Sequence, residues 1–246
     1  LTVVRYPAEM SDESFSSVLY GIREACDYFN VPNVGGDIGG AERLILSGTA
    51  LGVCKPGNAL MRRGARPGDV LCITGPTGLA GAAMKYFRAR KNQPEIESKY
   101  RKSLLAAWKR PEARVKQGIC LGNSKLVTSC IDTSDGLKAA VESIAIASRV
   151  SFTIYEDHVP ITPEVIAVCE HLGEEPMSVV MGDSVDFQLA FTVPEIHLEQ
   201  LTHEFANKNL RFIPIGIAVE GTRGQLLQPG GDMIDLPGST WRHDPD

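Results

Sequence analysis

Apolar residues recur along this chain with two spacings, one typical of helices and one typical of strands. From about Asp12 the apolar positions follow the helical spacing, and Ser11 is a suitable N-cap for that helix. Apolar runs predict strands over 1–4, 43–53 and 70–74. Further strands are predicted at 151–155, 187–193 and 212–219, and further helices up to 87, at 101–109, at 112–122 with Pro111 near the first turn, from 162 to Gly173, and at 195–207. Because helices and strands interleave throughout, we expect an α/β (α+β) fold.

Composition narrows the class of protein. The chain has 246 residues, enough for a large apolar core, and its net charge of −5 without a basic stripe argues against a nucleic-acid binder. No apolar run approaches the roughly 18 residues of a membrane span. The six cysteines are scattered without a Cys-x-x-Cys pair, which is typical of reduced core residues in a cytoplasmic protein. Because the chain begins with Leu1 and not with Met, we expect it to be processed, truncated or only partly covered.

The segment 131–137, Ile-Asp-Thr-Ser-Asp-Gly-Leu, is the most informative stretch. An apolar run precedes it and helical spacing follows it, which places Asp132 and Asp135 at a strand-to-helix junction. Their spacing lets both carboxylates face one point, and like charges that close favour a bound cation such as Mg²⁺. The alternative is structural: Ser134 or Asp135 caps the helix and Gly136 eases the turn. That alternative needs no Asp132 and does not exclude a metal.

Two glycine-rich segments carry features that suit phosphate. In 35–40, glycines let backbone N–H groups approach a phosphate while Asp37 holds its metal; the alternative is a flexible turn between strands. The segment 75–81 lies between a strand and a helix, but Thr77 stands where a dinucleotide fingerprint has its second glycine. A tight strand–helix turn built from small residues is the alternative there.

The connector 58–69 holds the tight basic cluster of the chain, Arg62, Arg63 and Arg66, and we place a domain boundary near it. Arginine forks suit phosphate oxygens, whereas a solvated linker is the plain alternative. No segment has a pattern of nucleophilic catalysis, so no residue is assigned a catalytic role. Carboxylate patches, glycine-rich turns and one arginine cluster together favour Mg²⁺–nucleotide chemistry, since phosphoryl transfer chiefly needs positioning and charge neutralisation.

Motifs in collinear order resemble the thiamine-monophosphate kinase family, part of the superfamily of aminoimidazole ribonucleotide synthetase, selenophosphate synthetase and the hydrogenase-maturation ATPases. They cover nearly the whole chain. The motifs are Arg23-Glu24-Ala25-Cys26, Val34-Gly35-Gly36-Asp37, Ser47-Gly48-Thr49-Ala50-Leu51-Gly52, Arg62-Arg63-Gly64-Ala65-Arg66-Pro67-Gly68-Asp69, Ile73-Thr74-Gly75, Arg110-Pro111-Glu112-Ala113-Arg114-Val115 and Ile131-Asp132-Thr133-Ser134-Asp135-Gly136-Leu137. The resemblance implies the second part of the superfamily's N-terminal sheet domain at 1–57 and a complete C-terminal α/β domain at 58–246.

The resemblance also implies a site. The implied ATP contacts are Gly36, Asp37, Arg62 and Ser134, and the implied Mg²⁺ ligands are Asp37, Asp132 and Asp135. Trp241 would line the thiamine-phosphate site, because a π-face suits a cationic thiazolium ring, although a buried tail anchor is the alternative.

Two departures from the family pattern stand out. The family's N-terminal portion is missing here. Where the family has Gly-Gly-Glu-Asp-Tyr-Glu-Leu, this chain has Asp183-Ser184-Val185-Asp186-Phe187-Gln188-Leu189. Val185 therefore replaces a glutamate that touches substrate in the family, and we expect Asp183 or Asp186 to take over its acidic role.

From this resemblance we expect a cytoplasmic, homodimeric kinase without nucleic-acid or membrane partners. It would use ATP and Mg²⁺ to phosphorylate thiamine phosphate, as a transferase of thiamine diphosphate biosynthesis. Two alternatives stay open: another ATP-using enzyme of the superfamily with a different acceptor, and a non-catalytic nucleotide-binding subunit.

Overall fold

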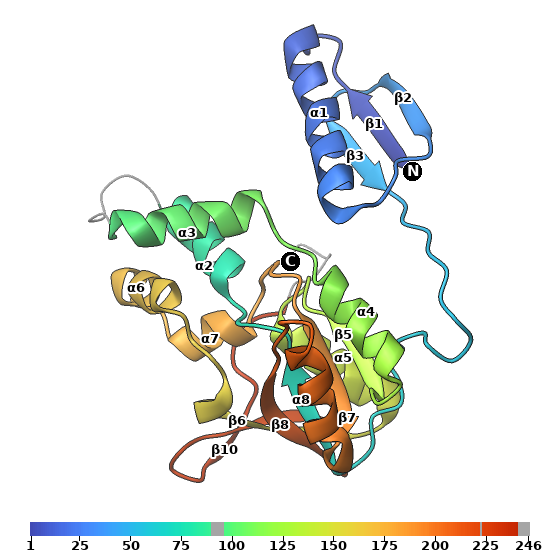
Figure 1. Ribbon diagram of the computed structural model, residues 1–246. Helices are drawn as coiled ribbons and strands as arrows, with labels where there is room; N and C mark the ends of the chain where they lie inside the picture. Colours follow the sequence, from blue (N-terminus) through green and yellow to red (C-terminus); the bar gives the residue numbers. More distant parts are fainter. Residues whose placement is uncertain (90–95, 222, 241–246) are drawn as a thin grey trace. The chain divides into compact units, whose positions relative to one another are not determined.

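The computed structural model describes residues 1–89, 96–221 and 223–240 (Figure 1). The chain divides into two compact units, Leu1–Lys55 and Pro56–Asp246, and each is described by itself. Within the described ranges, no helix is both long and apolar enough to span a lipid bilayer.

The first unit is a three-stranded sheet with one helix. Its elements are β1 (Thr2–Tyr6), α1 (Asp12–Phe29), β2 (Gly36–Gly40) and β3 (Ile45–Gly48). The strand order is β2-β1-β3, with β2 parallel and β3 antiparallel to β1. The predicted N-cap of α1 is confirmed, because the Ser11 hydroxyl accepts a hydrogen bond from the backbone N–H of Ser14 at 3.2 Å. Val4 of β1 is buried, and the ring of Tyr6 lies 4.6 Å from that of Phe15, so α1 packs on the Val4 face of the sheet.

Two predictions for this unit are wrong. The flexible turn considered for 35–40 is largely the strand β2, because β1 pairs with it from Thr2 to Tyr6. The long strand predicted over 43–53 is confined to β3, because β1 offers it partners only from Thr2 to Arg5. Pairing partners, which the local pattern does not reveal, decide both cases.

The second unit contains a seven-stranded sheet with the order β10-β9-β6-β8-β4-β7-β5. Its strands are β4 (Asp69–Ile73), β5 (Ser129–Asp132), β6 (Ser151–Tyr155), β7 (Leu189–Pro194), β8 (Ile213–Val219), β9 (Gly224–Leu227) and β10 (Met233–Asp235). Its α-helices are α2 (Leu79–Arg88), α3 (Ser98–Lys109), α4 (Val115–Ser124), α5 (Leu137–Ser148), α6 (Pro163–Leu172), α7 (Pro176–Met181) and α8 (Leu198–Ala206). Neighbouring strands are antiparallel except for the parallel pair β6 and β9.

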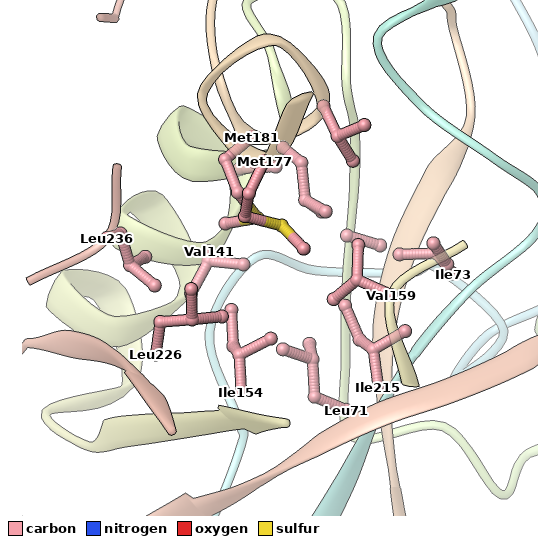
Figure 2. Packing of buried hydrophobic residues seen from close by; sticks show 14 of the residues in the cluster. Leu71, Ile73, Val141, Ile154, Val159, Met177, Met181, Ile215, Leu226 and Leu236 are labelled. Atoms are coloured by element: carbon pink, nitrogen blue, oxygen red, sulfur yellow. The ribbon is translucent and has the colours of Figure 1, made fainter. Parts of the chain in front are cut away.

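Helices cover both faces of this sheet, and strand alternation explains the two cores. Leu71 and Ile73 of β4 point to one face, where Figure 2 shows them in the same cluster as Val141 of α5 and Met177 of α7. Cys72, between them, points to the other face and packs with apolar side chains of α4 and α8. The α/β class expected from the sequence is confirmed.

Most predicted elements of this unit exist, with three exceptions at the level of detail. The helix predicted at 112–122 begins only at Val115, so Pro111 precedes it and does not lie in its first turn. The short helix α7 and the hairpin of β9 and β10 were not predicted, because each is too short to show a clear period.

Candidate functional site

The acidic pair lies at the junction of β5 and α5, as predicted. The capping interpretation is wrong: the N-cap of α5 is Gly136, and no side chain caps the helix. Gly136 has φ +94°, and a Cβ there would overlap the backbone carbonyl of Gly182. Asp132 Oδ2 accepts one weak hydrogen bond, from the N–H of Ser134 at 3.3 Å. The carboxylates of Asp132 and Asp135 are exposed and are not used to start the helix.

A third acidic residue, Asp183, lies near the acidic pair. Asp183 follows Gly182, whose carbonyl lies against Gly136, so the loop after α7 and the acidic loop are in contact. Burial, and then the charge of Asp135, raises the pKa of Asp183, while the charges of Arg88 and Lys85 lower it. The charge of Asp135 therefore acts on Asp183.

Asp186, in the same loop, uses its carboxylate as a hydrogen-bond acceptor within the protein. Its carboxylate accepts hydrogen bonds from the N–H groups of Gly78 (2.6 Å) and Ala80 (2.9 Å) and from the Ser184 hydroxyl (2.5 Å). Ser184 in turn accepts from the N–H of Gly81 at 2.9 Å. Three amides at the start of α2 are therefore satisfied within the protein, which matches the tight-turn alternative for 75–81.

A buried glutamine ties these segments together. The side-chain oxygen of Gln188 accepts from the Thr74 hydroxyl at 3.0 Å and from Nε of Arg114 at 2.9 Å. Its backbone exchanges hydrogen bonds with Thr133, between the two aspartates. Nη1 of Arg114 also lies 3.4 Å from the Glu112 carboxylate. Sequence reasoning missed the roles of Gln188 and Arg114, although Arg114 belongs to a recognised motif.

The connector that carries Arg62 runs beside β5. The carbonyl of Met61 accepts a hydrogen bond from the N–H of Cys130 at 2.8 Å, two residues before Asp132. The next residue, Arg62, is exposed, and no carboxylate in the described part of the chain pairs with it. Arg62 and the acidic pair therefore belong to neighbouring segments at one edge of the second unit's sheet.

The first unit holds Gly36 and Asp37 on β2. Asp37 forms an ion pair with Arg5 of β1 (Oδ2 to Nη2, 2.6 Å), and its other oxygen accepts from the N–H of Ile38 at 3.0 Å. The hydrogen bond and charge of Arg5 hold the pKa of Asp37 below its usual value. A Cβ on Gly36 would overlap the backbone of Thr2, so this close approach requires glycine.

A cleft of about 650 Å³ lies in this unit, within the size range of small-molecule pockets. Residues of β1, of α1, of the segment after α1 and of the start of β2 line it, and they include Gly36 and Asp37. Across the described ranges, no group of three or more His, Cys, Asp or Glu side chains is arranged to hold a metal by itself. Trp241, predicted to contact the substrate, lies outside the described residues.

Comparison with known proteins adds the family context. Residues 66–227 match the family model described as AIR synthase related protein, C-terminal domain. A thiamine-monophosphate kinase of Pyrococcus abyssi is 32% identical over 238 residues, which are 96% of this chain and 69% of that protein.

Solved structures show the same relationship. The thiamine-monophosphate kinase of Stenotrophomonas maltophilia is 25% identical, covering 95% of this chain and 72% of that one, with a TM-score of 0.81. A structure of AaThiL complexed with AMPPCP and TMP is 24% identical, covering 99% and 72%, with a TM-score of 0.78, and supports the fold.

Proposed function

This chain belongs to the thiamine-monophosphate kinase family among the AIR synthase related proteins, and from that premise we propose that it transfers the γ-phosphoryl group of ATP to thiamine phosphate, giving thiamine diphosphate. The observation that carries the proposal is the acidic pair at the end of β5. Asp132 and Asp135 are exposed, neither caps α5, and within the described residues neither pairs with a lysine or arginine. Two uncompensated carboxylates at a strand end are suited to a cation.

The proposed metal is Mg²⁺, and the proposed ligands are Asp132 and Asp135 in the second unit and Asp37 in the first. Their oxygens are the hard ligands that Mg²⁺ prefers, and one or two carboxylates suffice when phosphates and water complete the shell. Held by these carboxylates, Mg²⁺ would neutralise the charge of the phosphates.

The proposed ATP contacts are Gly36 and Asp37 in the first unit and Arg62 and Ser134 in the second. Arg62 is exposed beside β5 and has a fork suited to phosphate oxygens. We further propose that residues 1–57 correspond to part of the family's N-terminal domain and 58–246 to its C-terminal domain.

We favour Asp183 over Asp186 as the acidic residue that contacts the acceptor substrate. Burial and the charge of Asp135 raise the pKa of Asp183, and no hydrogen bond or ion pair is seen for its carboxylate among the described residues, whereas three hydrogen bonds already hold the carboxylate of Asp186. Trp241 remains a proposed contact for the thiazolium ring. A specific observation favours a second candidate, a kinase with another acceptor: Val185 is 36% exposed where the family has a glutamate.

A homodimer in the cytoplasm is also part of the proposal. The first unit exposes many large apolar side chains, and α1 has no fully buried residue. Such surfaces mark interaction sites, and a second copy of the chain is the proposed partner. These exposed side chains include Tyr20, Val34, Ile38, Ile45, Leu46, Leu51 and Val53. The six free cysteines, four of them buried, fit a reducing compartment.

The test is an acceptor screen with purified protein, ATP and Mg²⁺. Chromatography should show thiamine diphosphate and ADP formed in equal amounts, with no product for the Asp132→Asn variant. Turnover of a different phosphorylated acceptor would support the second candidate. ATP binding without turnover of any acceptor would overturn both and leave a nucleotide-binding subunit.

A further inference from the structure

Asp37 is one of the proposed metal ligands, and its carboxylate already forms an ion pair with the guanidinium of Arg5. The two residues lie on neighbouring parallel strands, where Arg5 is paired with Gly39 and Asp37 with Val3. Because side chains alternate along a strand, both point to the sheet face opposite buried Val4. The pair therefore stands on the face that α1 does not cover.

The strand β2 has a glycine, Gly39, opposite this arginine. A Cβ on Gly39 would overlap Nη1 of Arg5, and Gly39 has no positive φ that would otherwise require glycine. Glycine inside a strand weakens it, and it often marks a place where another group comes close. The group that comes close here is the guanidinium of Arg5.

The pair has little value for folding. The side chains are 35% and 63% exposed, and ion pairs with that exposure contribute little to stability. Within the described residues, Asp37 is the one side chain that Arg5 bonds. Arginine has five donors, so most of its fork is available to an anion.

We infer that Arg5 is a phosphate-binding residue that Asp37 holds in place until Mg²⁺ takes the carboxylate. The inference rests on the proposed function and adds a residue to it. If Asp37 bound the metal, its ion pair with Arg5 would open, and the guanidinium would stay on the same sheet face as Asp37, available to the phosphate oxygens of a metal-bound nucleotide. Arg5 therefore competes with metal alone but cooperates with metal-bound nucleotide.

The two roles predict opposite effects for Arg5→Gln. Calorimetric titration with Mn²⁺ alone should show about two- to fivefold tighter binding, because an exposed competing ion pair is gone. Titration with Mg-ATP should show about tenfold weaker binding, the lower end of the range for a lost charged hydrogen bond. Arg5→Lys should fall between the parent and Arg5→Gln in both titrations. Arg43→Gln is the matched control: it removes the same charge from the exposed turn after β2 and should change neither affinity.

A double-mutant cycle assigns the effect to Asp37. In the Asp37→Asn background, Arg5→Gln should no longer change Mn²⁺ affinity, whereas in the Asp132→Asn background it should. Weaker binding of both ligands, with altered circular dichroism, would assign Arg5 a structural role and overturn the inference. Unchanged affinities, or no Mn²⁺ binding that depends on Asp37, would overturn it as well. The acceptor screen decides the proposed function separately, because it measures product and not these affinities.

Discussion

Replacing both aspartates of the acidic pair should abolish Mg²⁺-dependent nucleotide binding and leave the fold almost untouched. The structure sets the stability part of this prediction. No side chain caps α5, so the roughly 1 kcal/mol that a lost cap typically costs does not apply to Asp132→Asn with Asp135→Asn. The double variant loses one weak, exposed hydrogen bond to Ser134 and relieves the repulsion between Asp135 and Asp183. These small effects oppose each other, and we expect a net change within about 0.5 kcal/mol.

A matched control has the opposite profile. The Glu175 carboxylate caps α7 in the same unit, accepting from the N–H groups of Met177 (3.0 Å) and Ser178 (2.6 Å). Glu175→Ala should therefore lose about 1 kcal/mol, which lowers the Tm of a unit of this size by about 2–4 °C. Its binding of Mg-ATP should match that of the parent.

Calorimetry with Mg-ATP and thermal unfolding of the three proteins check both halves. We expect the double aspartate variant to change only Mg-ATP binding, and Glu175→Ala to change only the Tm. If the double variant binds Mg-ATP like the parent, the carboxylates hold no metal. If its Tm falls by as much as that of Glu175→Ala, the pair has a structural role that its hydrogen bonds do not reveal.

Three further predictions test individual features. Gly136→Ala should destabilise the protein by at least about 2 kcal/mol in denaturant titrations, because a Cβ at φ +94° is strained and overlaps a backbone carbonyl. Burial and the charge of Asp135 raise the pKa of Asp183 in the folded state, so the unfolded chain loses that proton at lower pH and the stability of the protein falls as pH rises between the two pKa values. Relative to the parent, Asp183→Asn should gain up to about 0.5 kcal/mol of stability above this pH window and nothing below it. A variant whose Tm equals that of the parent at every pH would contradict the pKa shift. Burial raises the pKa of Cys130 to about 12, so a thiol reagent should modify exposed Cys54 within minutes and reach Cys130 only on unfolding, and mass spectrometry of the native protein checks this.

The sequence was informative where local chemistry decides the structure. The Ser11 cap, the left-handed Gly173 at the end of α6 and the acidic junction after β5 follow from spacing and residue type within a few positions. The same logic failed for β2, whose glycines read as a turn. That segment is a strand because β1 supplies partners along its whole length and because its glycines admit close neighbours from β1.

Long-range partners account for most of the rest. The sequence around residues 75–81 does not indicate that the carboxylate of Asp186, more than a hundred residues later, accepts hydrogen bonds from the N–H groups of Gly78 and Ala80. The hydrogen bond between Gln188 and Arg114 joins positions 74 residues apart. Both partners lie in segments that resemblance had marked, but their roles depend on a fold that brings those segments together.

The bonding of the loop after α7 has a consequence for how acceptor preference could change during evolution or in the laboratory. Ser184 and Asp186 are tied to the start of α2, and Gln188 is tied to β4 and to the acidic loop, so substitutions there would disturb several segments at once. The side chains of Asp183 and Val185, which alternate with them, form no such hydrogen bonds within the part of the chain that the structure describes. These two positions can vary independently of the scaffold, and a library aimed at new acceptors should randomise them and leave their neighbours intact.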